Sequence, residues 1–248
     1  MAGPMEQFEI KPQGDLFEIA GQQISWTNSA FWMVVTVALI IGFFLLTLRG
    51  KLIPGRMQSM GELSYQFIAD MVRDTVGPEA MRFLPFVFAL FFFILFANLI
   101  GMNPYAFTTT SHLAVTAALS FFTIFVVIIA GIWKNGFKWF KIFVPSGLPL
   151  PVYVLIIPIE IISFLARPVT LAVRLFANMV AGHVMLKLFA IFAAYLVAKG
   201  GITAFGAILP VVGTIGIIAL EFLVAALQAF VFAILTCIYL NDVYHVDH

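Results

Sequence analysis

Charge is the scarcest property of this sequence. Only 10% of its 248 residues are charged and 62% are apolar, whereas an ordinary globular domain has roughly 25% charged residues. The 13 basic and 12 acidic side chains nearly cancel, so neither a nucleic-acid-binding basic field nor a solvating acidic arm is indicated. A water-soluble surface cannot be built from this composition, which predicts an all-α polytopic membrane protein.

Cysteine is almost absent. Cys237 is the single one in the sequence, which excludes an internal disulfide framework, a multi-cysteine metal cluster and a redox pair. It lies in an apolar run and is interpreted as a small packing residue. We predict neither a metal site nor a cofactor.

The amino-terminal part has no basic region of the kind that precedes a signal peptide core. Residues 1–28 contain four carboxylates and Lys11 as the one basic residue, so we predict a polar outer segment and no cleavable signal. Residues 29–48 are apolar and long enough to cross a hydrocarbon core of roughly 30 Å. Arg49 and Lys51 close this first predicted span on one side.

The next two regions predict an interfacial helix and a hairpin. Residues 52–82 mix charged side chains with apolar ones at helical spacing, which favours an amphipathic interfacial helix. Residues 83–133 contain two spans joined by a short uncharged turn. Basic residues follow the first and third spans, and the positive-inside rule therefore places those loops in the cytoplasm and the amino terminus outside. The charges of the carboxyl-terminal tail leave its side undecided.

Residues 149–240 form two apolar runs that are too long for simple crossings. The first covers roughly 50 residues, or about 75 Å as a helix, and Lys199-Gly200-Gly201 marks a turn before the second. Either each run breaks into two spans, or both are long helices that lie steeply tilted. Pro158 and Pro168 are compatible with a break or with a kink.

Ionisable residues within these runs predict the functional site, because such groups at bilayer depth usually face a water-filled cavity or a partner. They are Glu160, Arg167, Arg174, His183, Lys187 and Glu221. At 100° per residue, Glu160, both arginines and Asn178 fall within an arc of about 40°. This polar stripe indicates an ion path; the structural alternative is a Glu160 and Arg167 pair that locks helices together.

If residues 149–240 fold back at Gly201, residues at similar distances before and after this turn come to lie opposite one another. The pairs are Arg174 with Gln228, His183 with Glu221, and Glu160 with Asp242. A histidine opposite a glutamate inside a membrane favours a proton relay over a purely structural pair. His183 lies about 180° around the helix from Arg174, so we expect the two residues to act at separate points of the ion path.

These residues resemble a known family. The run from Arg167 to His183, Arg-Pro-Val-Thr-Leu-Ala-Val-Arg-Leu-Phe-Ala-Asn-Met-Val-Ala-Gly-His, is similar to the signature of subunit a of F-type ATP synthases. The resemblance extends to Glu221, to Leu227-Gln228-Ala229-Phe230 and to the order of spans. It implies five membrane helices beside the amphipathic one, the tilted-hairpin alternative, and a cytoplasmic carboxyl terminus.

The resemblance also implies a function and partners. Arg174 would be the essential stator arginine that faces a carboxylate of a rotating c-ring, with Asn178 and Gln228 as polar neighbours. Protons would enter one half-channel past His183 and Glu221 and leave through another near Glu160. The expected partners are c-ring subunits, peripheral-stalk b subunits and membrane lipid, in a bacterial inner membrane or, alternatively, a mitochondrial one.

Two other classes were weighed. A secondary ion-coupled transporter would also carry mid-membrane charges, but it typically shows an internal repeat, and none is visible in the sequence. A respiratory-chain membrane subunit that binds haem or quinone would need paired histidines or an aromatic cleft. Only His112 and His183 lie away from the tail, which disfavours that class.

Overall fold

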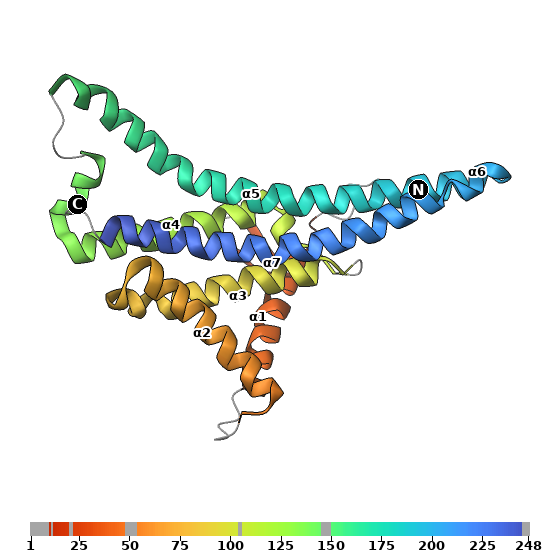
Figure 1. Cartoon of the computed structure of the whole chain (residues 1–248), viewed down its shortest axis with the longest axis horizontal. Helices are drawn as coiled ribbons and strands as arrows, with labels where there is room; N and C mark the ends of the chain where they lie inside the picture. The colour runs from red at the N-terminus through yellow and green to blue at the C-terminus, as the bar shows by residue number, and fades with distance from the viewer. Residues whose placement is uncertain are drawn as a thin grey trace. The chain divides into compact units, whose positions relative to one another are not determined.

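The computed structural model describes residues 10, 12–19, 22–47, 54–103, 106–144 and 150–244. Helices dominate these residues (Figure 1). The elements in chain order are β1 Pro12–Ile19, β2 Gln22–Thr27, α1 Asn28–Thr47, α2 Arg56–Val76, η2 Pro78–Phe83, α3 Leu84–Gly101, η3 Thr109–Ser111, α4 Leu113–Asn135, η4 Gly136–Phe143, α5 Leu150–Lys199, α6 Ile202–Phe205 and α7 Ile208–Tyr244, where η marks a 3-10 helix.

Five helical segments of the described chain are long and apolar enough to cross a membrane. They are Asn28–Thr47, Pro78–Gly101, Leu113–Phe140, Val152–Lys199 and Ile202–Tyr244. Many of their apolar side chains are exposed in the isolated chain, as expected where lipid or partner subunits replace water. The predicted all-α polytopic membrane fold is confirmed.

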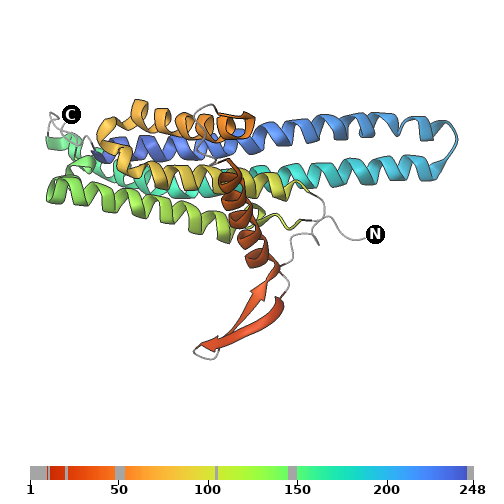
Figure 2. The same cartoon turned by 90° about the horizontal axis from the view of Figure 1, so that it is seen from below.

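A β-hairpin precedes the first span, and the sequence analysis did not predict it. Strands β1 and β2 pair antiparallel, from Pro12 opposite Thr27 to Ile19 opposite Gln22 (Figure 2). The signal was present: Ile24 and Trp26 alternate with polar residues along β2, and period-two alternation is typical of a strand.

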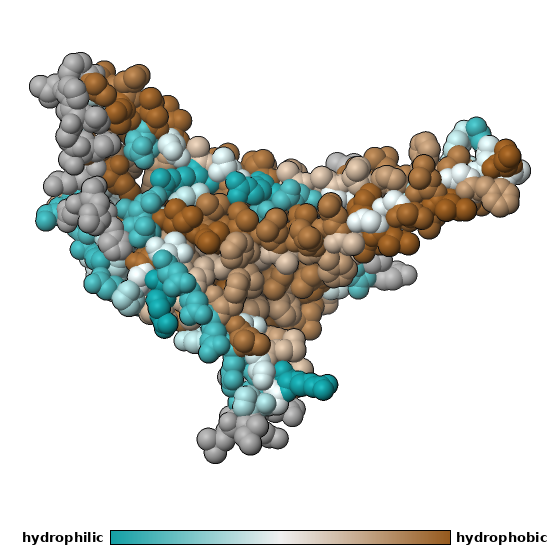
Figure 3. Space-filling view, viewed as in Figure 1, coloured by the Kyte–Doolittle hydropathy of each residue, from teal (hydrophilic) through white to brown (hydrophobic). Residues whose placement is uncertain are grey.

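Helix α2 is the amphipathic element. Figure 3 shows hydrophilic residues along one side of it, and its buried residues Ile68, Met71 and Val72 fall at helical spacing. It ends where Gly77 adopts φ 107° and donates its N–H to the Arg73 carbonyl at 3.0 Å. That backbone conformation favours glycine, so the predicted helical stretch over residues 52–82 is divided here, and η2 follows.

The last two helices settle the alternative left open by their length. Helix α5 continues for 50 residues through both Pro158 and Pro168, and α7 continues for 37. Gly200 and Gly201, at φ 68° and 61°, make the turn between α5 and α6. Two long helices therefore form instead of four spans. At about 75 Å, α5 exceeds twice the hydrocarbon core and must be tilted to stay within it.

The described chain divides into two compact units. The first combines the residues of Met1–Ile41, Phe93–His112 and Leu175–Gln228, and the second those of Gly42–Phe92, Leu113–Arg174 and Ala229–His248. In the first unit, the later half of α5 lies beside the earlier part of α7 (Figures 1 and 2). In the second, Arg167 in the first half of α5 forms an ion pair with Asp242 near the end of α7.

Candidate functional site

Arg167 is the arginine of the polar stripe on α5 that has a carboxylate partner. Its Nη1 lies 2.9 Å from Oδ2 of Asp242 on α7, and its guanidinium lies 4.8 Å from the centroid of the Tyr239 ring. From the sequence, Glu160 is the alternative partner of this arginine. In the structure that partner is Asp242, which the hairpin alignment had placed level with Glu160. Glu160 is half-buried and has neither a hydrogen bond nor an ion pair with any described residue.

Arg174, two turns further along α5, is exposed in the isolated chain. Within the described residues its guanidinium makes no hydrogen bond and no ion pair. It lies among Val173, Leu175 and Phe176 in an apolar helix, where a charged side chain costs about 3 kcal/mol or more. The described residues therefore supply no carboxylate in direct contact with Arg174.

Two amides form a bridge between α5 and α7 in the first unit. Asn178 donates from Nδ2 to Oε1 of Gln228 at 3.0 Å. Asn178 is exposed, whereas Gln228 is buried, and Nε2 of Gln228 has no hydrogen-bond partner among the described residues. The amide pair therefore retains one buried donor for water or for a group outside this chain.

His183 is buried in the same unit and binds a residue from the α3–α4 connection. Its Nε2 lies 3.0 Å from Oγ1 of Thr108, and that hydroxyl donates to the carbonyl of Gly101 at 3.0 Å. A threonine hydroxyl has one proton. Because that proton is directed to Gly101, Thr108 accepts from His183, and the arrangement favours the imidazole form that carries a proton on Nε2.

Glu221 lies against α5 at Gly182, the residue before His183. A Cβ added to Gly182 would overlap Oε1 of Glu221, so a side chain other than glycine would displace this carboxyl group. Glu221 is 6% exposed. Neither of its carboxylate oxygens has a hydrogen-bond partner in the described part of the chain. The hairpin brings Glu221 next to the His183 segment, while the histidine bonds to Thr108.

The polar surroundings of these residues include groups that the sequence analysis passed over. Asn98 on α3 is fully buried, contacts the Ala225 carbonyl at 3.5 Å and has no bonded partner for Oδ1 within the described residues. Oγ1 of buried Thr110 also has no hydrogen-bond partner within the described residues. Thr108 and Thr110 lie in the short uncharged turn between the two spans predicted within residues 83–133, and Asn98 lies in the first of these spans. An isolated amide in such a span was the available signal.

Buried polar atoms in native proteins are nearly always bonded to protein or to ordered water. Several such atoms without a protein partner gather in the first unit, on Asn98, Thr110, Glu221 and Gln228. The same unit contains the ionisable side chains of Glu221 and His183.

The fold and these side chains define an all-α polytopic membrane protein with ionisable and amide groups inside its spans. A sequence model of the ATP synthase A chain family matches residues 30–241. The chain therefore belongs to the ATP synthase A chain family, as the resemblance predicted.

Relatives of similar length support this assignment. The chain is 57% identical to ATP synthase subunit a of Hyphomonas neptunium, over 98% of this chain and 96% of the relative. It is 52% identical to ATP synthase subunit a of Nitrobacter winogradskyi over the full length of both. Identity to ATP synthase subunit a of Rhodopseudomonas palustris is 54%, over 100% of this chain and 99% of the relative.

Proposed function

We propose that this chain is the proton-conducting stator subunit of an F-type ATP synthase in a bacterial inner membrane. It has no catalytic activity by itself and works beside a rotating c-ring, held in place by peripheral-stalk b subunits. Family membership and the names of the relatives support the assignment to the complex. The state of Arg174 carries the proposal for its mechanism.

Arg174 acts as the latch between the stator and the ring. Of the two arginines on the α5 stripe, Arg167 is paired with Asp242 and Arg174 has no carboxylate partner among the described residues. An exposed, uncompensated cation at this depth attracts a deprotonated carboxylate of the ring. Guanidinium stays protonated under all relevant conditions, so Arg174 holds the carboxylate without passing a proton on.

His183 and Glu221 belong to the outer half-channel. The buried polar atoms without protein partners on Asn98, Glu221 and Gln228 support water access in this unit. Protons that enter here neutralise a ring carboxylate, which releases it from Arg174. The Asn178 and Gln228 bridge supplies uncharged polar groups beside that exchange.

Glu160 belongs to the inner half-channel. It lies 14 residues before Arg174 on the same continuous helix, which corresponds to about 21 Å. Its carboxyl group has no partner among the described residues, so it can accept a proton from the ring and deliver it to water. Arg167 lies between Glu160 and Arg174 along α5. The charge of Arg167 is balanced by Asp242, so Arg174 is the arginine of the stripe whose charge no described carboxylate balances.

The test is ATP-driven proton pumping by reconstituted complexes that carry Arg174→Ala or Arg174→Lys. We expect both variants to assemble and hydrolyse ATP but to lose pumping, because alanine has no charge and a desolvated lysine can release its proton. Arg73→Ala is the matched control, since Arg73 lies on α2 and its ion pair is exposed. Near-normal pumping by Arg174→Ala would rule out the latch.

A further inference from the structure

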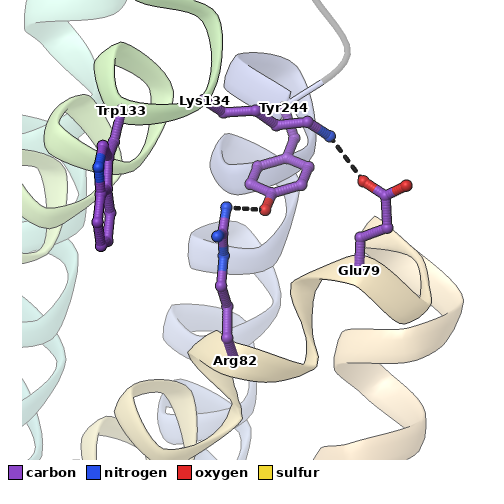
Figure 4. A pocket seen from close by; sticks show the side chains of 5 residues that line it. All are labelled: Glu79, Arg82, Trp133, Lys134 and Tyr244. Atoms are coloured by element: carbon purple, nitrogen blue, oxygen red, sulfur yellow. Dashed lines mark hydrogen bonds and ion pairs between the residues drawn. The ribbon is translucent and has the colours of Figure 1, made fainter.

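A polar cavity lies in the second unit, where α7 ends. Its volume is about 360 Å³, and it is lined by Glu79, Arg82, Trp133, Lys134 and Tyr244. These residues come from η2, from the end of α4 and from the end of α7 (Figure 4). At about 30 Å³ per water molecule, the cavity has room for roughly a dozen waters or for a compact headgroup.

The lining carries more positive than negative charge. Lys134 forms an ion pair with Glu79 at 2.9 Å, and the Glu79 side chain is 73% exposed against 28% for Lys134. Arg82 has no carboxylate partner among the described residues; it donates to the hydroxyl of Tyr244 and lies 5.3 Å from the centroid of the Tyr244 ring. Among the described residues, two cations therefore face the cavity with one carboxylate, and that carboxylate is the more exposed member of its ion pair.

The position of the cavity indicates which class of ligand it binds. It lies where three predicted spans end, at the beginning of Pro78–Gly101 and at the ends of Leu113–Phe140 and Ile202–Tyr244. Trp133 is 81% exposed there, and exposed tryptophan beside basic residues is typical of the headgroup level of a membrane. Basic pockets between transmembrane helices on the cytoplasmic side bind phosphate-bearing lipid headgroups.

We propose that this cavity binds the phosphate of one anionic phospholipid headgroup. Arg82 and Lys134 bind the phosphate oxygens, with Lys134 exchanging the exposed Glu79 for the ligand, and Tyr244 keeps Arg82 oriented by accepting its hydrogen bond. The acyl chains lie along the apolar ends of the three spans.

The test uses the purified full chain, equilibrated with mixed micelles of phosphatidylcholine and phosphatidylglycerol and examined by native mass spectrometry. We expect one retained phosphatidylglycerol per chain. Arg82→Gln and Lys134→Gln should each weaken its retention about fivefold, the factor that corresponds to about 1 kcal/mol per basic residue at a lipid headgroup.

Two control variants separate binding from folding. Lys138→Gln removes the same charge from η4 but does not line the cavity, so it should leave retention unchanged. Tyr244→Phe removes the hydrogen bond to Arg82 and keeps both cations, so its loss should be smaller than that of Arg82→Gln. Equal losses in all four variants would show a general effect of charge or stability and would overturn the site.

A second arm distinguishes a lipid from a soluble anion. Inorganic phosphate at millimolar concentration is added to the chain in phosphatidylcholine and in mixed micelles. We expect it to displace phosphatidylglycerol poorly, because the lipid is also held by its acyl chains. Full displacement by inorganic phosphate would assign the cavity to a free anion and overturn the lipid proposal.

Discussion

At the scale of single residues, the hydroxyl of Thr108 is a positioning group for His183. Replacement by valine keeps the shape but removes the acceptor at 3.0 Å from Nε2, and a buried donor without a partner costs about 1 to 3 kcal/mol. We expect Thr108→Val to slow ATP-driven proton pumping about tenfold, which is the factor for 1.4 kcal/mol. Pumping by reconstituted complexes and the tautomer of His183 by nitrogen-15 NMR are the measurements.

Two substitutions control for this effect. Thr108→Ser restores the hydroxyl and should restore both pumping and tautomer. Thr123→Val makes the same change at a buried position whose hydroxyl bonds only to the Leu119 carbonyl one turn earlier in α4, and it should have little effect. If Thr108→Val leaves the NMR spectrum of His183 unaltered, the positioning role is wrong.

At the scale of elements, the ion pair between Arg167 and Asp242 connects the first half of α5 to the end of α7. The side chains are 18% and 34% exposed, so the pair is partly desolvated. Asp242→Asn leaves the arginine uncompensated, and we expect a loss of about 1 to 3 kcal/mol, between the values for exposed and fully buried pairs. A lower melting temperature of the detergent-solubilised chain is the measurement.

The reversed pair, Arg167→Asp with Asp242→Arg, should recover part of that stability, whereas each single reversal should not. Asp70→Asn on α2 is the matched control, because it breaks an exposed pair with an N to O distance of 3.8 Å and should leave the melting temperature nearly unchanged. Equal shifts for Asp70→Asn and Asp242→Asn would show that the α5–α7 pair contributes no more than a surface contact.

At the scale of the whole molecule, we expect the two proposed half-channels to open to opposite faces of the membrane. Glu160 and Gly182, the residue that Glu221 packs against, are 22 residues apart on continuous α5. This is about 33 Å along the helix axis; the tilt of α5 shortens the component of this length across the membrane but does not reverse the order of the two positions. We expect cysteine at position 160 to react with an impermeant thiol reagent from the cytoplasmic face of sealed vesicles, and cysteine at 221 from the outer face.

The labelling needs a background without the native thiol, and Cys237→Ala is suitable because Cys237 is fully buried in α7. A cysteine at Phe122, on the exposed surface of α4, reports reaction through lipid and should label poorly from either face. Reaction of positions 160 and 221 from the same face would contradict the two-channel arrangement even if Arg174 proved essential.

The sequence by itself determined the class, the spans and the stripe. Apolar composition and run length are properties of consecutive residues, and they suffice to predict a helical membrane protein because a lipid environment permits few other structures. The number of five membrane helices was implied by the family resemblance, since run length left the last two regions open between two and four spans. The placement of Arg167, Arg174 and Asn178 on one side of α5 follows from 100° per residue alone. The family signature lies within that same helix, so it was equally readable.

Tertiary structure decided which groups meet. Arg167 contacts Asp242 and not Glu160, and His183 contacts Thr108, while Glu221 settles at Gly182. Each of these choices depends on the rotation and relative height of helices that are distant in the sequence. Helical periodicity specifies a face but not its partner, because a shift of one turn, about 5.4 Å, exchanges one set of side-chain contacts for another.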